Sequence, residues 1–279
     1  MPRRDRGLTS PWFTTALLAP FLVLLLAMFA YPMWQVVSTS VSDGAFPFED
    51  YAVVLADPIM WISLGRTLLI STLVALVCLL LGYPLASLIA SASGGWQVAL
   101  LALVVVPMWS SVIARTFAWF GMFRPNGVVN AVLGALGLPE AELLFTPTAV
   151  VIGMANVMLP ILILPVFAAL NRYDRSLSLA AATMGAGPLR TLFQIKLPVL
   201  APQIITGCAA VFILSMGFFI SPALLGGPRS SMISNLIYQQ IRDRFDFGRA
   251  DAIAVILIIV TLLIAGLLLL VSRALRRRA

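Results

Sequence analysis

The chain has 279 residues, of which 61% are hydrophobic and 10% are charged, with a net charge of +7 and a mean hydropathy of +1.03. A soluble protein of this size needs more charge to cover its surface, so the composition excludes an ordinary soluble globular fold. The cations are not concentrated in one basic domain, which argues against nucleic acid as a partner.

Apolar runs of about twenty residues, the length that crosses a bilayer as a helix, predict an all-α polytopic protein with six transmembrane helices. They form one transmembrane domain over residues 1–279. The first run, Leu17 to Tyr31, is long for a signal peptide, lacks a clear Ala-x-Ala exit and precedes further spans, which favours an uncleaved helix. The expected spans are 14–37, 65–90, 97–118, 145–169, 203–225 and 251–272.

The distribution of charge predicts that both chain termini are cytoplasmic, because cytoplasmic segments of membrane proteins are rich in Arg and Lys. With this orientation the cytoplasmic parts hold eleven Arg or Lys and two acids, and the remainder holds seven Arg or Lys and nine acids. The last external loop carries nearly equal numbers of positive and negative side chains, so it does not help to assign the orientation.

Two external segments, 38–64 and 119–144, are long enough to fold. The first carries four acids and no cation. In the second, Pro125-Asn126-Gly127 predicts a turn, and the apolar periodicity that follows predicts a short helix.

The cytoplasmic loop 172–200 contains LAAATMGAGPLRTLFQIKLP, residues 179–198, which predicts two short helices at an angle. Ser176 is the expected N-cap of the first helix, with an apolar face made by Leu177, Ala180, Ala181 and Met184. Gly185 and Gly187 break this helix, and Pro188 begins a second one that ends at Leu197-Pro198. The apolar face either packs against the protein's own helices or docks in a groove of a partner protein.

This loop resembles that of the permease subunits of binding-protein-dependent ABC importers. Those loops carry Glu-Ala-Ala, then Gly, then Ile-x-Leu-Pro, and this chain matches the spacing at Ala180-Ala181, Gly185, Ile195 and Leu197-Pro198. The departure is Leu179, which replaces the Glu. If Ser176 is the N-cap, this Leu cannot complete a capping box, so we expect a frayed helix start and the loss of any polar contact the family's Glu makes with its partner.

The resemblance implies the type I ABC importer permease (MetI-like) fold and a subunit that forms half of a translocation pathway in a bacterial inner membrane. It implies a second permease, expected to differ from this chain, two ATPase subunits and a periplasmic substrate-binding protein. No G-x-x-x-x-G-K-[ST] motif occurs, so no cofactor is expected in this chain, and ATP and Mg belong to the ATPase subunits. The residues expected to couple to them are Leu179, Ala180, Ala181, Ala182, Met184, Gly185, Ala186, Leu197 and Pro198.

Segments outside the loop also resemble the branch of this family that handles spermidine and putrescine. The shared features are the Arg-Thr-aromatic-Ala-Trp run at 115–119, Asn130 ahead of an apolar helix, and Pro222 followed by Leu-Gly-Gly-Pro at 225–228. The resemblance therefore implies a polyamine or related amine as substrate.

No predicted span interior contains an acid, so the substrate path is assigned to small polar and aromatic residues. Helix packing by small residues is the alternative interpretation of this set. We give Arg115 a structural role. The path candidates are Trp109, Ser110, Ser111, Ser215, Phe218, Phe219, Ser221 and Asp251.

Two other classes of membrane protein were weighed. An ion-coupled secondary transporter is the first alternative, but the sequence shows neither ionisable residues at mid-membrane nor paired broken helices. A membrane enzyme is disfavoured because the chain has no histidine and a single lysine, Lys196. No catalytic or metal-ligating residue is assigned, and Cys78 and Cys208 are expected to be small buried side chains.

Overall fold

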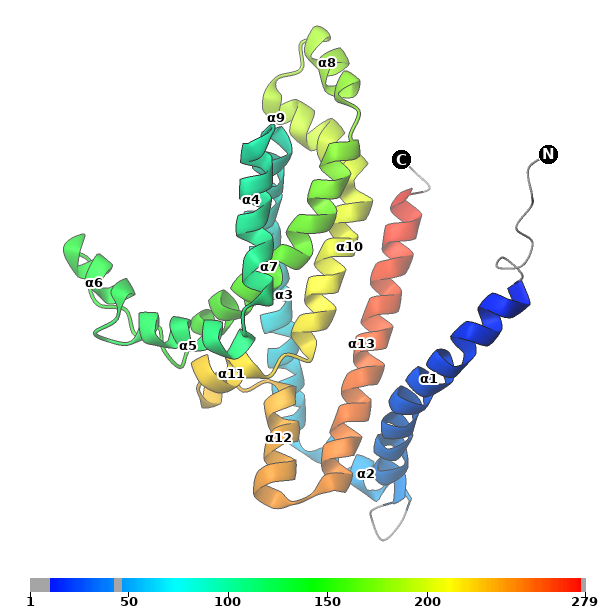
Figure 1. Cartoon of the computed structure of the whole chain (residues 1–279). Helices are drawn as coiled ribbons and strands as arrows, with labels where there is room; N and C mark the ends of the chain where they lie inside the picture. Colours follow the sequence, from blue (N-terminus) through cyan, green and yellow to red (C-terminus); the bar gives the residue numbers. More distant parts are fainter. Residues whose placement is uncertain (1–10, 43–46, 277–279) are drawn as a thin grey trace.

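The computed structural model describes residues 11–42 and 47–276, and nearly all of these residues are helical (Figure 1). Helices long and apolar enough to cross a membrane are α1 (Pro11–Ser42), α3 (Pro58–Ser91), α7 (Pro147–Arg172), the stretch from α9 (Pro188–Thr191) through α10 (Leu197–Met216), and α13 (Phe247–Arg276). A bent pair of shorter helices makes a sixth candidate span. The predicted all-α membrane fold is confirmed.

The elements alternate in direction, so that the start of α1, the end of α13 and the α8–α9 loop lie at one end of the molecule (Figure 1). The short helices α2 (Glu49–Ala56) and α12 (Ile233–Arg244) lie at the opposite end. This arrangement is compatible with the predicted topology, but the side of the membrane on which each end lies stays a prediction. The basic residues within 1–10 and 277–279, on which that prediction partly rests, lie outside the described residues.

The core of the bundle is formed by α3, α7 and α10, which pack on one another. On α3 the residues that recur every fourth position are small or medium-sized and buried: Val74, Cys78, Gly82 and Ala86. A Cβ on Gly82 would lie 2.6 Å from Cδ2 of Leu162 in α7, so glycine is what allows these two helices to approach. Cys78 is fully buried in this contact, as expected of a small core residue.

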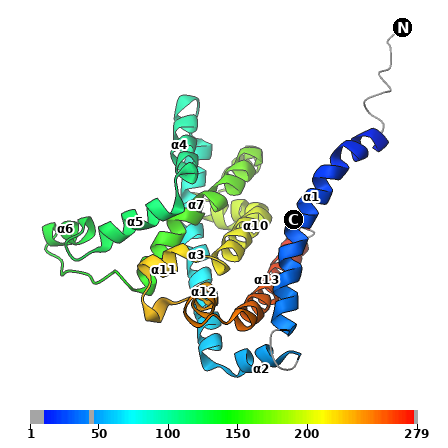
Figure 2. The same cartoon turned by 60° about the horizontal axis from the view of Figure 1, so that its bottom comes forward.

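α1 lies apart from this core and packs along α13 (Figure 2). Within its candidate span, Leu17–Val41, no residue of the most apolar window is buried inside the chain. An all-apolar helix with such exposure requires lipid or another protein around it.

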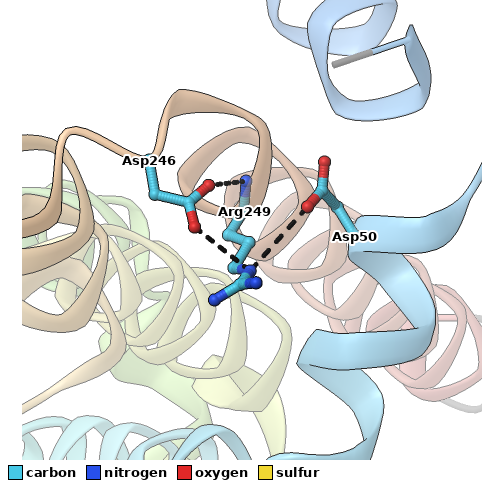
Figure 3. A network of polar contacts seen from close by, with 3 residues as sticks. All are labelled: Asp50, Asp246 and Arg249. Carbon is cyan, nitrogen blue, oxygen red and sulfur yellow. Dashed lines mark hydrogen bonds and ion pairs between the residues drawn. The ribbon is translucent and has the colours of Figure 1, made fainter. Parts of the chain in front are cut away.

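A second, smaller apolar cluster joins α3, α12 and α13 at the end that carries α2. Thr67 in α3 accepts a hydrogen bond from the backbone N–H of Ile233 at 2.9 Å, which satisfies a donor in the first turn of α12. Figure 3 shows Arg249 of α13 between two carboxylates. Its Nε lies 3.1 Å from Oδ2 of Asp246 and 3.9 Å from Oδ1 of Asp50 in α2. Asp246 also accepts the backbone N–H of Arg249, so this carboxylate caps the start of α13.

The prediction of one continuous span at 97–118 is wrong. The chain forms α4 (Gly95–Val105) and a 3₁₀ turn (Val106–Trp109), and then bends by 101° into α5 (Val112–Phe123). Pro107 cannot donate to the carbonyl four residues earlier, Ser110 is extended, and the Ser111 hydroxyl accepts from the N–H of Ala114 as an N-cap. The apolar run hides a helix stop followed directly by a helix start.

The predicted span 203–225 also ends early, because α10 stops at Met216 and the short helix α11 (Ile220–Leu225) follows. Gly217 is the C-cap of α10. A continuous helix would place the ring of Pro222 against the carbonyl of Phe218, whereas in α11 Pro222 lies in the first turn, where an N–H has no helical partner. Two of the six predicted spans are therefore broken helices.

Beyond its bend, α5 continues into an arm that projects from the bundle (Figures 1 and 2). After the turn at 125–127 comes α6 (Val128–Ala135), the short helix expected there. Asn130 is buried and makes hydrogen bonds to both the N–H and the carbonyl of Ala141, at 2.9 and 3.3 Å. The Asn130 side chain therefore links α6 to the non-helical segment that contains Ala141.

Candidate functional site

The cytoplasmic loop predicted at 172–200 forms an elbow of α8 (Arg175–Thr183) and α9 that extends beyond the bundle (Figure 1). The N-cap of α8 is Asp174 and not Ser176: its carboxylate accepts the backbone N–H of Ser176 at 2.9 Å. This hydrogen bond lowers the pKa of the exposed Asp174 carboxyl below its ordinary value. Leu179 therefore lies in the second turn of α8, outside any capping box, so the expected frayed start, which assumed Ser176 as the N-cap, loses its basis.

The end of α8 is closed by a complete Schellman motif. The N–H of Ala186 bonds to the carbonyl of Ala181 at 3.0 Å, and the N–H of Gly185 bonds to the carbonyl of Ala182 at 3.0 Å. Gly185 has φ of +80°, a conformation that costs little only for glycine. The reversal between the two helices is thus fixed by backbone hydrogen bonds and one glycine.

The second helix does not end at Leu197-Pro198, which corrects that prediction. Gly187 is the N-cap of α9 and Pro188 its first residue, and the chain then passes through a π-helical segment, Leu192–Lys196, directly into α10. Pro198 cannot bond to the carbonyl of Gln194, and the wider π turn, in which the N–H of Leu197 bonds to Leu192, accommodates the ring. The elbow is consequently joined to α10 by one uninterrupted helix.

The apolar face expected on α8 divides in two. Ala181 is turned inward and is only 6% exposed, whereas Met184 is 88% and Leu189 of α9 is 70% exposed. Of the two alternatives left open for this face, packing within the chain applies to Ala181, and exposure to a partner applies to Met184. The outer face, defined as the exposed apolar side chains of the elbow, consists of Leu177, Leu179, Ala180, Ala182, Met184, Leu189 and Phe193.

The two broken spans meet beyond their breaks, where α5 and α11 pack against each other (Figure 1). Thr116 and Ser221 are both buried, and their hydroxyl oxygens are 3.3 Å apart. Since the Thr116 hydroxyl already donates to the carbonyl of Val112 at 2.9 Å, Ser221 is the donor in this pair. Non-helical backbone at membrane depth is tolerated where it faces a cavity or other protein, so the two breaks are the structural candidates for a path.

Most of the residues predicted to line the substrate path lie at or beside these two breaks, but not all of them do. Trp109, Ser110 and Ser111 form the first break and are exposed, whereas Ser215 and Ser221 flank the second break and are fully buried. The ring of Phe219 packs at a tilt of 46° against that of Tyr238 in α12, with centroids 4.9 Å apart, and the carbonyl of Phe218 accepts a hydrogen bond from the Ser234 hydroxyl at 2.7 Å.

Asp251 does not belong to the breaks. It lies half-buried in the second turn of α13, a helix that contacts α2 and α12 at this end of the molecule. Its place is therefore beside the Asp246–Arg249 network and not within the broken spans.

Two residues that the sequence analysis did not assign are brought into these sites. Thr116 was noted only as part of the Arg-Thr-aromatic-Ala-Trp run, but it joins the two broken spans. Lys196 was noted as the only lysine, but it lies at the end of the π-helical segment beside α8. The sequence feature that could have identified Thr116 is that a small polar residue interrupts an apolar run. For Lys196, the feature is that the only lysine of the sequence lies shortly before a predicted span.

Comparison with known proteins identifies the family. No protein-family model matches the sequence. The chain is 33% identical over 231 residues to the spermidine/putrescine transport system permease protein PotB of Escherichia coli (strain K12), covering 81% of each chain. The chain belongs to the permeases of binding-protein-dependent ABC importers. This permease is also 30% identical over 276 residues to the sulfoquinovosyl glycerol transport system permease protein SmoG of Agrobacterium fabrum, covering 92% of this chain and 89% of SmoG.

Solved structures share the fold of this permease. A crystal structure of a bacterial ABC transporter for the import of alginate matches with a TM-score of 0.74, covering 96% of this chain and 98% of that one at 20% identity. The same kind of transporter in complex with an alginate pentasaccharide-bound periplasmic protein matches with a TM-score of 0.71 and 20% identity, over 99% and 98% of the two chains. The permease is thus a multi-pass membrane transport subunit with the fold of ABC importer permeases.

Proposed function

We propose that this permease forms half of the translocation pathway of a bacterial inner-membrane importer for a polyamine such as spermidine or putrescine. The observation that carries the substrate class is the similarity to PotB over four fifths of the chain. The aromatic residues at the two breaks, Trp109, Phe218 and Phe219, support it, because aromatic faces attract ammonium groups without requiring acids within the membrane.

The elbow is the proposed site of coupling to ATP hydrolysis. Its outer face is apolar and exposed in this chain, and such a surface fits the groove of a partner. The Schellman motif at Gly185 and the continuous helix into α10 stiffen the connection, so that a displacement of the elbow is carried into the bundle. In this proposal the two ATPase subunits bind ATP and Mg, and the permease supplies only the elbow that transmits their movement to the transmembrane helices.

A second permease and a periplasmic binding protein complete the proposed transporter. Support for the second permease comes from α1, because no residue in its most apolar window is buried by the described part of the chain. Support for the binding protein comes from the fold match to an importer that carries one.

The proposed function is tested by reconstituting the permease in nanodiscs with the ATPase, the second permease and the binding protein that are encoded by neighbouring genes. We expect ATP hydrolysis to rise when binding protein is added with spermidine or putrescine, and not when it is added with a neutral sugar. Stimulation by sugar alone would contradict the polyamine assignment, and hydrolysis that never responds to loaded binding protein would contradict an importer.

A further inference from the structure

A half-open recess of about 390 Å³ lies between α8 and the ends of α3 and α7, with polar groups set among apolar side chains. Four hydroxyl groups and one ammonium group line it, with no carboxylate among the lining residues. The residues that matter here are Ser87, Ser91, Tyr173, Ser178, Leu179 and Lys196.

Lys196 is the only lysine in the sequence, and the π-helical segment ends at it. π-helical turns are rare and cost hydrogen-bond geometry, so they are often retained where they place a side chain for function. Within residues 11–42 and 47–276, Lys196 forms no ion pair, in contrast to Arg249. Lys196 is therefore a half-buried residue with no carboxylate within ion-pair distance of its ammonium group.

The hydroxyl groups of the recess can still donate. The Tyr173 and Ser178 hydroxyls are 2.9 Å apart, and since one of them donates to the other, one proton of the pair remains for a ligand. Ser91 uses its proton on the carbonyl of Leu88, at 2.8 Å. The last turns of α3 and α7 also end here, and their partial negative charge favours an ammonium at this position without neutralising it.

Leu179 lines the same recess and is 67% exposed. It occupies the position at which the family pattern has Glu, so an apolar side chain stands where an acid is usual, beside the cation Lys196. The recess lacks the acid that could pair with Lys196 from within the chain.

We propose that Lys196 and the free hydroxyl of the Tyr173–Ser178 pair receive a carboxylate from an acidic side chain of the ATPase subunit. This inference rests on the proposed function of the elbow as the docking site. Charge complementarity carries it: one unpaired ammonium and hydroxyl donors in a recess form a site for a carboxylate. Leu179 of α8 is exposed and also lines the recess together with Lys196, so the proposed partner meets the recess where it contacts α8 at this residue.

The test uses the fact that the chain has one lysine. The assembled transporter is treated with a water-soluble carbodiimide, which joins an ammonium and a carboxylate in contact through an amide bond. We expect mass spectrometry to find Lys196 linked to an Asp or Glu of the ATPase subunit. Leu179→Glu, which offers a competing carboxylate within the recess, should lower the yield of that link.

Affinity measurements complete the test. Lys196→Met should weaken the binding of the ATPase subunit by about fivefold at low salt and reduce its salt dependence, as expected for loss of one partly exposed ion pair. Lys196→Arg should retain both affinity and salt dependence while losing the link. The matched control is Arg172→Met, which removes a cation from the same end of the molecule but from a different recess, and should leave the salt dependence unchanged.

The outcomes separate this inference from the proposed function. If the wild-type permease binds no ATPase subunit, the proposed function fails. If the ATPase subunit binds but no link to Lys196 forms and Lys196→Met has no effect, the inference alone is overturned. It is also overturned if the effect of Lys196→Met is present in vesicles containing phosphatidylglycerol and absent in vesicles of phosphatidylcholine alone, which would assign the recess to a lipid headgroup.

Discussion

Ala186 donates its backbone N–H to the carbonyl of Ala181 at 3.0 Å, and this hydrogen bond closes the end of α8. The same two residues explain the shape of the elbow, because Ala181 is buried beneath it and Ala186 begins the reversal toward α9. The reversal depends on Gly185, which lies between Met184 on the exposed face and Ala186. Coupling should therefore be sensitive to the backbone at Gly185 before it is sensitive to any side chain there.

Gly185→Ala should reduce binding-protein-stimulated ATP hydrolysis. No atom lies within 4 Å of a Cβ at this position, so the cost is conformational, and it is about 1–2 kcal/mol for a non-glycine residue with positive φ. Gly185→Asn should retain more activity, because Asn tolerates this conformation. Gly65→Ala is the control: a Cβ at Gly65, within α3, would also meet no atom within 4 Å, and its φ is not positive, so this variant should keep full activity. Equal activity of all three variants would contradict a role for the reversal.

The Asp174 cap predicts a pH dependence at acidic pH. Its pKa is lowered in the folded state, so the capping contribution is fully present above the unfolded value of about 4 and is lost as pH falls through the folded value. In a titration followed by ¹³C NMR of labelled aspartate, the pKa of the Asp174 carboxyl should be lower than that of an aspartate side chain in an unfolded peptide. Asp174→Asn should keep the helix start and remove the pH dependence, whereas Asp174→Ala should lose the cap at every pH. A carboxyl that titrates at or above the free value would contradict the cap.

The hydrogen bond from Ser221 to Thr116 predicts an asymmetric pair of mutations. Thr116→Val leaves the buried Ser221 hydroxyl without an acceptor, which costs about 1–3 kcal/mol. Adding Ser221→Ala removes the orphaned group, so the double variant should be more stable than Thr116→Val alone. Thermal unfolding in detergent measures this cycle. Additive losses would show that the two broken spans are not joined by this bond.

The orientation of the elbow can be tested by labelling. In a chain whose native cysteines are replaced by alanine, Leu189→Cys at the elbow and Arg244→Cys at the opposite end present exposed thiols. We expect a membrane-impermeant maleimide to label Arg244→Cys in spheroplasts and Leu189→Cys only in inverted vesicles. The reverse pattern would place the elbow outside the cell and contradict both the topology and the coupling role.

Much of the fold follows from apolar runs, because a run of about twenty such residues has few alternatives to a spanning helix. The breaks at Ser110-Ser111 and Gly217 escaped prediction because the flanking residues are as apolar as those of a continuous span. Their signals were local: Pro107 followed by two serines, and Gly217 followed by Pro222. The argument that paired broken helices are missing, used against a secondary transporter, therefore does not hold, and the family assignment decides that question instead.

In the elbow, the order of elements was predictable, and their exact contacts were not. Ser176 and Asp174 are both good N-caps, and the choice between them depends on where α7 ends, which is set by tertiary packing. Ala181 shares a helical face with Met184 by spacing, yet Ala181 is covered, whereas Met184, the C-cap of α8, is exposed. Consequently Ala181→Arg disrupts the elbow from beneath, and a surface test must use Ala182 or Met184.

The central claim is that the exposed apolar face of the elbow contacts an ATPase subunit. The direct measurement places a photo-crosslinking amino acid at Met184 in the assembled transporter, with Gln239 in α12 as an exposed control position at the opposite end. The account predicts a crosslink from position 184 to the ATPase subunit and none from position 239. A crosslink from position 184 only to lipid or to the permease chains, in a complex that retains its ATPase subunits, would contradict it.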